Sequence, residues 1–205
     1  MAVQTKLNIK MTIQFVLNDQ IVFAINNGTE TLLDYIRYKA HLKGTKIGCR
    51  EGDCGACTVL GGSLEDEKIY YKNIISCLTP LANVHGKHVV TVEGINESGL
   101  NLVQKAIVAN SGTQCGFCTP GFVMSLCSFV LNNNEPELSV AISSMDGNIC
   151  RCTGYKSLER AANSIINDLQ VLDKTSWMDS LIQAEFIPPY FKSIHQKLSV
   201  ITPLS

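Results

Sequence analysis

The spacing of apolar side chains divides the chain into a first part with a period of two and a second part with a period near 3.6. Residues 12–25 alternate apolar and polar positions on both sides of a polar break at Asn18-Asp19-Gln20, which predicts a β-hairpin. The apolar positions of this hairpin are Ile13, Phe15, Leu17, Ile21, Phe23 and Ile25.

The first part of the chain also predicts one helix and further strands. Thr31, with Asp34 three residues later, is typical of a capping box, and the helix that follows is expected to end near Gly44. Strands are expected at 57–60 and 68–75, separated by Gly61-Gly62, with a last strand through Val89, Val90 and Val92. Together these elements predict a small β-grasp-like domain.

The second part predicts a helical bundle that follows a hinge at Gly94–Gly99. Its helices are expected at about 100–110, at 119–132, after Pro136, and at 153–169. The helix at 119–132 is apolar nearly all round, so it should lie at the centre of the bundle. Four short helices with brief connections indicate a four-helix bundle, and the fold class is therefore α+β.

The last residues, 172–205, form an extension rich in aromatic and proline side chains. These include Trp177 and the run Phe186-Ile187-Pro188-Pro189-Tyr190-Phe191. Such side chains are unusual in a purely solvated tail, so we expect the extension to pack on a partner rather than to be a disordered end.

Composition limits the classes of partner and compartment. The chain has 205 residues, of which 45% are apolar and 17% are charged, as in an ordinary globular protein of one or two small domains. Its formal net charge of −1 offers no electrostatic case for nucleic acid or an anionic membrane as a partner. With no signal peptide and no long apolar run, the nine cysteines are expected to be thiolates in the cytoplasm.

The first group of cysteines is the most specific chemical signal in the chain. Cys49, Cys54 and Cys57 have the spacing Cys-x4-Cys-x2-Cys, and Cys77 follows. This is the ligand pattern of a plant-type [2Fe-2S] ferredoxin. A structural zinc site built from the same four thiols is the alternative, although zinc thiolates usually come as two Cys-x2-Cys pairs.

The residues between these cysteines fit a bound anion. Gly48, Gly52 and Gly55 can turn backbone N–H groups inward to form a nest around a negatively charged cluster. The charged residues of the same loop are Arg50, Glu51 and Asp53. They are expected to be solvated turn residues, with electrostatic tuning of the loop as the alternative.

A second group of four cysteines lies in the helical part. Cys115 and Cys118 are spaced Cys-x2-Cys, and Cys150 and Cys152 are spaced Cys-x-Cys. Each pair precedes a predicted helix, with Thr119 and Thr153 as the expected N-caps. Two helix N-termini would then favour an anionic iron–sulfur cluster, although tetrahedral zinc competes more strongly here than at the first group.

The remaining candidates are expected to be structural. Cys127 lies in mid-helix among apolar neighbours and should be a small buried hydrophobe. His41, His85 and His88 are expected at the surface or in turns.

Three motifs together resemble the iron–sulfur subunit or domain of the xanthine oxidase (xanthine dehydrogenase) family of molybdenum hydroxylases. They are Gly48 to Cys57 (GCREGDCGAC), Gln114 to Gly121 (QCGFCTPG) and Gly147 to Tyr155 (GNICRCTGY). The resemblance covers roughly residues 10–170. It implies a ferredoxin-like domain at 1–93, a helical domain at 94–171 and a linker-like extension at 172–205, with one [2Fe-2S] cluster in each domain.

The resemblance also implies ligands, partners and a function. The first cluster would be bound by Cys49, Cys54, Cys57 and Cys77, and the second by Cys115, Cys118, Cys150 and Cys152. Gln114 and Cys152 would touch a molybdopterin cofactor that is held mainly by a large partner subunit, and FAD would lie on another subunit or domain.

By that resemblance the chain is an electron-transfer subunit that is not catalytic alone. It would pass electrons from molybdopterin through both clusters to the flavin during oxidation of xanthine or hypoxanthine. Enzymes acting on aldehydes, carbon monoxide or N-heterocycles such as nicotinate are alternatives within the family. A stand-alone ferredoxin-type carrier and a zinc-stapled interaction module are alternatives outside it.

Overall fold

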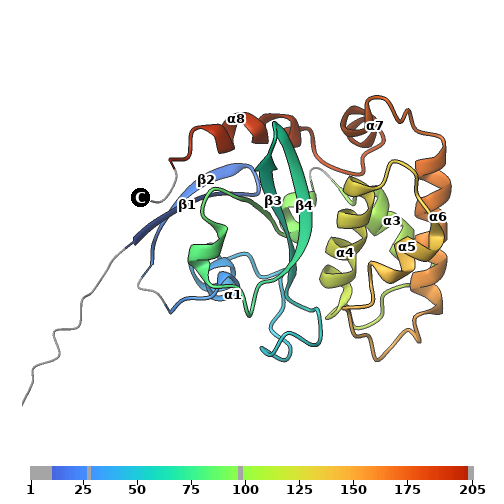
Figure 1. Ribbon diagram of the computed structural model, residues 1–205. Helices are drawn as coiled ribbons and strands as arrows, with labels where there is room; N and C mark the ends of the chain where they lie inside the picture. Colours follow the sequence, from blue (N-terminus) through green and yellow to red (C-terminus); the bar gives the residue numbers. More distant parts are fainter. Residues whose placement is uncertain (1–10, 27–28, 97–98, 203–205) are drawn as a thin grey trace, which may run out of the picture.

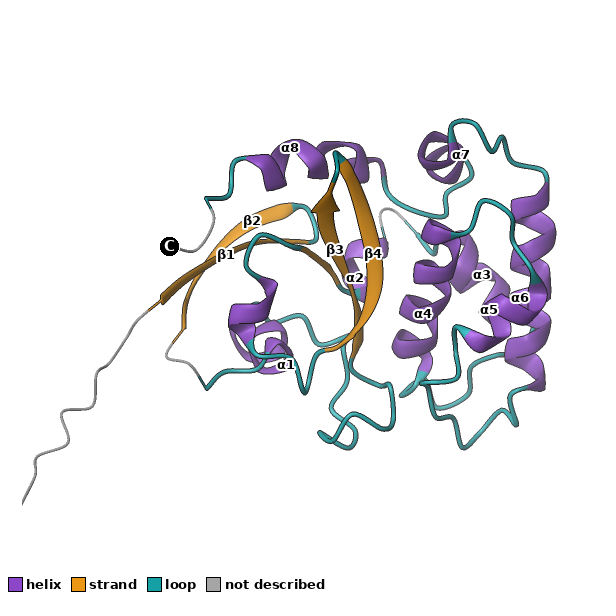
Figure 2. Cartoon of the chain, in the orientation of Figure 1, coloured by secondary structure: helices purple, strands orange, loops and turns teal. Residues whose placement is uncertain are grey.

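The computed structural model describes residues 11–26, 29–96 and 99–202. A five-stranded sheet forms one half of the molecule and helices form the other (Figures 1 and 2). The strands are β1 (Met11–Leu17), β2 (Gln20–Asn26), β3 (Thr58–Glu65), β4 (Lys68–Ile75) and β5 (His88–Val90). They lie in the order β2-β1-β5-β3-β4, with β1 and β5 parallel and the other neighbours antiparallel.

The predicted hairpin is confirmed, and its register decides which apolar side chains enter the core. Ile13 pairs with Ala24 and Phe15 pairs with Val22. All four side chains lie on the face of the sheet that packs against the helical turns of α1 and η1. Phe23 is opposite Gln14, so Phe23 projects from the other face, where it is exposed. The alternation in β1 therefore builds the core, whereas the alternation in β2 places its largest side chain in solvent.

The prediction that Gly61-Gly62 separates two strands is wrong. Both glycines lie inside β3, and the turn to β4 is made by Asp66 and Glu67, which have φ of 45° and 64°. A Cβ on Gly61 would lie 2.1 Å from Ile74 Cδ1, so this position lacks a side chain because β4 packs against it. A local turn signal is thus overridden by cross-strand packing.

The helix after the hairpin begins where predicted but is shorter. Thr31 caps α1 (Leu32–Asp34), since its hydroxyl oxygen accepts a hydrogen bond from the Asp34 N–H at 3.2 Å. The helix continues as the π-helical turn η1 (Tyr35–Lys39) and ends there rather than near Gly44. The Arg37 side chain donates to the backbone carbonyls of Lys43 and Thr45, which holds the following segment in a non-helical path.

The four predicted helices of the second part are present: α3 (Leu102–Ala109), α4 (Thr119–Asn132), α5 (Leu138–Ser143) and α6 (Lys156–Gln170). Helix α4 lies between the sheet and the other three helices (Figure 1). It is buried from Gly121 to Leu131, as its apolar sequence predicted. The Asn132 side chain also donates to the Tyr71 carbonyl oxygen at 2.8 Å, so α4 is fixed to β4.

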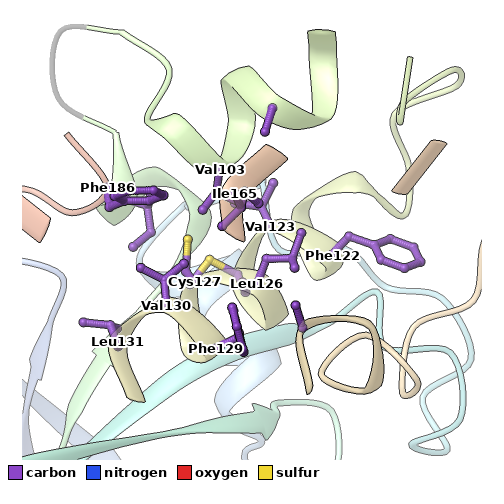
Figure 3. Close-up of a cluster of buried hydrophobic side chains, with 14 of the residues drawn as sticks. Val103, Phe122, Val123, Leu126, Cys127, Phe129, Val130, Leu131, Ile165 and Phe186 are labelled. Carbon is purple, nitrogen blue, oxygen red and sulfur yellow. The ribbon is translucent and has the colours of Figure 1, made fainter. Parts of the chain in front are cut away.

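A continuous hydrophobic core joins the two halves. It contains Leu60, Tyr71 and Val90 from the sheet together with the inner faces of α3, α4 and α6. Gly94, where the hinge was expected to begin, is buried in the short helix α2 (Val92–Ile95), and residues 97–98 lie outside the described part. Cys127 lies within this core, fully buried as predicted (Figure 3).

The C-terminal extension folds back over its own chain. It contains α7 (Trp177–Gln183), the 3-10 turn η3 (Pro189–Ser193) and α8 (Ile194–Ser199). A further 3-10 turn, η2 (Leu81–Val84), lies outside the extension, between β4 and β5. Phe186 is fully buried beside α4 (Figure 3). The Trp177 Nε1–H donates to the Val130 carbonyl oxygen at 3.0 Å. Against the prediction, the aromatic side chains of this segment pack on the chain itself.

Among the described residues, no helix has the length and apolar character needed to cross a membrane.

The prediction that His88 lies at the surface or in a turn is wrong. His88 is fully buried in β5, where its Nδ1 lies 2.8 Å from the Tyr71 hydroxyl and its Nε2 lies 2.9 Å from the Asn18 carbonyl oxygen. Because a carbonyl oxygen only accepts, Nε2 carries the proton and Nδ1 accepts from Tyr71. The ring also contacts Phe191 of the extension.

Acidification is expected to destabilise the fold through His88. Burial lowers its pKa to about 3, against 6.5 for an exposed histidine, so the unfolded state binds a proton that the folded state excludes. Stability is therefore full above pH 6.5 and should fall by about 1.4 kcal/mol per pH unit as the pH drops below that value. Urea unfolding at pH 7.5 and pH 5.5 measures this slope.

A matched pair of variants separates His88 from the other titrating groups. His88→Gln keeps a donor and an acceptor but cannot titrate, so its pH slope should be smaller by that amount. His85→Gln makes the same substitution three residues before His88, at a half-buried position outside the sheet, and serves as the comparison variant. Equal slopes in His88→Gln and the wild type would contradict the assignment.

Candidate metal centres

The first group of cysteines lies at one end of the sheet. Cys57 directly precedes β3 and Cys77 follows β4, and the paired strand ends Thr58 and Ile75 bring them together. The Ser76 hydroxyl donates to the Cys57 carbonyl oxygen at 2.7 Å, which fixes the two segments to each other. Cys49 and Cys54 lie on the loop that leads into β3.

The N-terminus of α1 holds the turn that carries Cys77. The Leu32 N–H donates to the Thr79 carbonyl oxygen at 2.8 Å, and the Leu33 N–H donates to the Ser76 carbonyl oxygen at 3.1 Å. Because α1 has few other partners for these first N–H groups, the turn and the helix stabilise each other.

The thiols of this group interact in pairs. Hydrogen bonds from the Glu51 and Cys54 backbone N–H groups, followed by one from the Cys54 thiol, lower the pKa of Cys49 to about 7. Burial, followed by a hydrogen bond with Cys57, raises the pKa of Cys77 to about 11. Cys49 therefore faces Cys54, and Cys57 faces Cys77.

Two glycines of the loop are required by close approach. A Cβ on Gly48 would lie 2.6 Å from Cys54 Sγ, so a side chain there would occupy the space of a ligand. Gly55 has a φ of +67°, and a Cβ on it would lie 2.2 Å from the Gly147 carbonyl oxygen of the helical half. The loop is thus shaped both around its thiols and against the second group.

Arg50 is exposed, as expected, but it also forms an ion pair that the sequence did not predict. Its Nη2 lies 2.7 Å from Asp34 Oδ1 and its Nη1 lies 3.3 Å from Asp34 Oδ2, which forms a two-point ion pair. The hydrogen bond from Arg50 lowers the pKa of Asp34, with burial opposing it. Glu51 and Asp53 are exposed, as expected.

The second group of cysteines lies where α4 and α6 begin. Cys118 is the N-cap of α4, so Thr119, the predicted N-cap, is instead the first residue of the helix. Helix α6 begins at Lys156 rather than at the predicted Thr153, because Gly154 and Tyr155 adopt φ of 63° and 66°. Thr153 instead places its hydroxyl 3.2 Å from Cys150 Sγ. One helix N-terminus therefore adjoins this site directly, and the other is separated from it by a turn.

These thiols also gather two by two. Cys152 Sγ lies 3.8 Å from Cys115 Sγ, and the hydrogen bond between them raises the pKa of Cys152. Burial, followed by a hydrogen bond with Cys150, raises the pKa of Cys118 to about 12. Cys150 itself is buried, which opposes its ionisation, but hydrogen bonds from Thr153 outweigh burial and lower its pKa.

The pairwise arrangement fits a [2Fe-2S] cluster, in which four cysteines supply two thiolates to each of two irons. A tetrahedral zinc ion would need four such ligands around one point. The thiol geometry therefore favours two-iron clusters at both groups.

A polar bridge joins the two groups. The Ile149 N–H donates to the Cys54 carbonyl oxygen at 3.0 Å, and the Asn148 side chain donates to the Gly55 carbonyl oxygen at 3.0 Å. Asn148 is fully buried in this contact, and its own oxygen accepts from the Ser125 hydroxyl at 2.7 Å. Asn148 lies within the third sequence motif, but the motif indicates no role for it, because only the fold brings Asn148 to the loop that carries Cys54.

Gln114 lies at the solvent-exposed side of the second group, which is called its open side below. Its Nε2 donates to the Cys152 carbonyl oxygen at 3.2 Å, which holds the side chain beside the exposed thiols of Cys115 and Cys152. Cys118 and Cys150 lie deeper, so the second group presents one thiol pair to the surface.

Two family models match the chain. Residues 15–82 match a "2Fe-2S iron-sulfur cluster binding domain", and residues 91–163 match a "[2Fe-2S] binding domain". These ranges contain the first and the second group of cysteines respectively.

Similar proteins include long oxidoreductases. Xanthine dehydrogenase of Emericella nidulans is 44% identical over 162 residues, and aldehyde oxidase 3 of Mus musculus is 39% identical over 160 residues. These matches cover 77% and 72% of this chain but only 12% of each relative. The chain thus spans about an eighth of the length of these relatives.

A solved structure matches over nearly its full length. A chain of quinoline 2-oxidoreductase from Pseudomonas putida 86 is 32% identical, with a TM-score of 0.67, over 78% of this chain and 96% of that chain. The motifs, the fold and the paired thiols agree with these matches. The chain therefore belongs to the family of iron–sulfur subunits and domains of the molybdenum hydroxylases, which includes those of xanthine dehydrogenase and aldehyde oxidoreductase.

Proposed function

We propose that this chain carries electrons between a molybdopterin site and a flavin, both on partner subunits or domains, during oxidation of xanthine or hypoxanthine. Each bound [2Fe-2S] cluster would accept and pass on one electron at a time. Cys49, Cys54, Cys57 and Cys77 would hold one cluster, and Cys115, Cys118, Cys150 and Cys152 the other. The chain itself supplies the ligands, their spacing and the surfaces that partners meet.

The polar bridge between the two groups carries this proposal. A ligand of the first cluster, Cys54, shares a hydrogen bond with Ile149, the residue before Cys150 of the second. The two loops are also held together by the buried Asn148. A short, rigid connection of this kind is what an electron relay needs, and a protein with two independent metal staples would not require it.

The open side of the second group is the face that we assign to the molybdopterin partner. Cys115 and Cys152 are exposed there, and Phe117, Ile149 and Tyr155, each within three residues of a cysteine of this group along the chain, are exposed apolar side chains. An exposed apolar rim of this kind is typical of a protein interface. Gln114 and Cys152 would contact the pterin from this face, as the family resemblance implies.

The substrate assignment follows the relatives. Xanthine dehydrogenases are among the most similar proteins, but an aldehyde oxidase and a quinoline oxidoreductase share the same iron–sulfur architecture. Purines, aldehydes and N-heterocycles are therefore the substrate classes to compare.

An anaerobic bleaching experiment tests the proposal on the assembled enzyme, isolated through a tag on this chain. Xanthine or hypoxanthine is expected to bleach the visible absorbance of both clusters, because electrons enter from the molybdenum side. Dithionite serves as the control that reduces the clusters directly. Bleaching by dithionite and by an aldehyde or quinoline, but not by purines, would overturn the substrate assignment; no bleaching by any reductant would overturn the relay.

A further inference from the structure

Arg50 is the one basic residue in the loop from Gly48 to Cys57, which also carries Glu51 and Asp53. It directly follows Cys49 and has a φ of 61°, a left-handed conformation that a non-glycine residue adopts only at some strain. With this backbone conformation, the Arg50 guanidinium meets the Asp34 carboxylate, with Nη2 2.7 Å from Oδ1 and Nη1 3.3 Å from Oδ2. Two parallel hydrogen bonds of this kind are the strong form of an ion pair.

Asp34 lies on the element that positions the fourth cysteine. Its carboxylate accepts a hydrogen bond from the Thr31 hydroxyl at 2.9 Å, and Thr31 is the N-cap of α1. The next residues of α1, Leu32 and Leu33, donate their N–H groups to the turn that carries Cys77. The Arg50–Asp34 pair therefore connects the segment of Cys49 with the segment of Cys77.

The pair also places one charge on the residue after Cys49 and the opposite charge on the helix whose N-terminus holds the turn of Cys77. A cationic group next to a cluster favours its reduced, more negative form, and an anionic group disfavours it. With both present, the net electrostatic effect is small and the geometric effect remains. Removing either charge alone should expose the effect of the other.

We propose that Arg50 and Asp34 are positioning residues that clamp the first cluster's loop and balance the charge that sets its reduction potential. The inference rests on the proposed function in one respect: Cys49, Cys54, Cys57 and Cys77 must bind a redox-active cluster. It does not depend on the substrate or on any partner.

Two substitutions break the same ion pair but change the charge in opposite directions. Arg50→Gln leaves Asp34 unbalanced, so the midpoint potential of the first cluster should fall. Asp34→Asn leaves Arg50 unbalanced, so it should rise. We expect each to change the ratio of reduced to oxidised first cluster by about threefold to tenfold at a fixed solution potential, where tenfold corresponds to about 59 mV for one electron. An EPR-monitored reductive titration of the isolated chain measures both potentials.

The controls distinguish electrostatics from structure. Lys39→Gln breaks the 2.8 Å ion pair between Lys39, the last residue of η1, and Glu30, which precedes α1, and it should leave both potentials unchanged. The second cluster is an internal reference in every variant. If Arg50→Gln fails to assemble the first cluster, Arg50→Lys, which keeps the charge, should retain the wild-type potential while Asp34→Asn still raises it.

The outcomes separate this inference from the proposed function. Shifts in the same direction in Arg50→Gln and Asp34→Asn, or no shift in either, would overturn the charge balance while leaving the relay intact. Absence of any cluster signal in the wild type would overturn the relay and this inference together. Normal signals with opposite shifts support the inference even if xanthine is not the substrate.

Discussion

Replacing Cys150 with serine is expected to remove the second iron–sulfur cluster and leave the first one bound. Cys150 is buried, it hydrogen-bonds with Cys118, and Thr153 stabilises its thiolate, so a neutral hydroxyl cannot take its place as an iron ligand. Iron should fall from about four to about two atoms per chain, because each [2Fe-2S] centre is lost as a unit. Cluster binding is coupled to folding, so the helical half should also melt at a lower temperature.

Cys127→Ser provides a matched control in the same bundle. Cys127 is equally buried, but its polar neighbour is the Asn101 side chain, whose Nδ2 lies 3.6 Å from the sulfur. A serine hydroxyl can accept that hydrogen bond. Both clusters, and therefore about four irons per chain, should remain. Iron and sulfide analysis with EPR on the reduced proteins distinguishes the two variants. Full iron content in Cys150→Ser, or loss of a cluster in Cys127→Ser, would contradict the ligand assignment.

Local patterns predicted the parts of this fold that local sequence determines. The hairpin follows from alternation around a polar turn, and the limits of α4 follow from its apolar run and from Pro120 at its start. The cysteine groups were also found from spacing, because metal ligands on one loop must be close in sequence. The residues of the hairpin and of α4 interact with near neighbours along the chain, whereas Cys115 and Cys152 of the second group meet from positions 37 residues apart.

The errors arose where distant residues decide the outcome. His88 is buried because Tyr71 and Asn18 supply its hydrogen bonds, and neither is close to it in sequence. Gly61 lies within a strand because Ile74 needs its space. The C-terminal extension was expected to meet a partner because no sequence pattern showed that α4 and the sheet leave an apolar surface for it.

The same distinction applies to the candidate sites. The cysteines were predicted, whereas the Arg50–Asp34 pair and the bridge from Asn148 to Gly55 were not. Both unpredicted features join segments that the fold brings together from separate elements. These contacts fix the position of each cysteine group within the fold and relative to the other group. The spacing of the cysteines along the chain does not predict such contacts.

Substituting Gly55 with alanine is expected to damage both stability and the connection between the clusters. The residue has a φ of +67°, and its new Cβ would meet the Gly147 carbonyl oxygen at 2.2 Å and Asn148 Nδ2 at 2.4 Å. The first of these contacts is with backbone, which cannot rotate away. The left-handed conformation costs about 1–2 kcal/mol for alanine, and the overlap adds about 1–3 kcal/mol. Relief of the overlap must move the two loops apart and lengthen the Ile149–Cys54 and Asn148–Gly55 hydrogen bonds.

Gly86→Ala isolates the backbone part of this effect. Gly86 has a φ of +70°, and its Cβ would meet nothing within 4 Å, so only the conformational cost of about 1–2 kcal/mol should appear. Freeze-quench EPR on the assembled enzyme, mixed with the substrate that bleaches it, should show slower reduction of the first cluster in Gly55→Ala and an unchanged rate in Gly86→Ala. Equal rates in both variants would mean that the relay does not depend on contact at Gly55. A slower rate in Gly55→Ala alone, with both clusters still bound, would place the electron path at the contact between the Cys54 loop and the segment that carries Cys150.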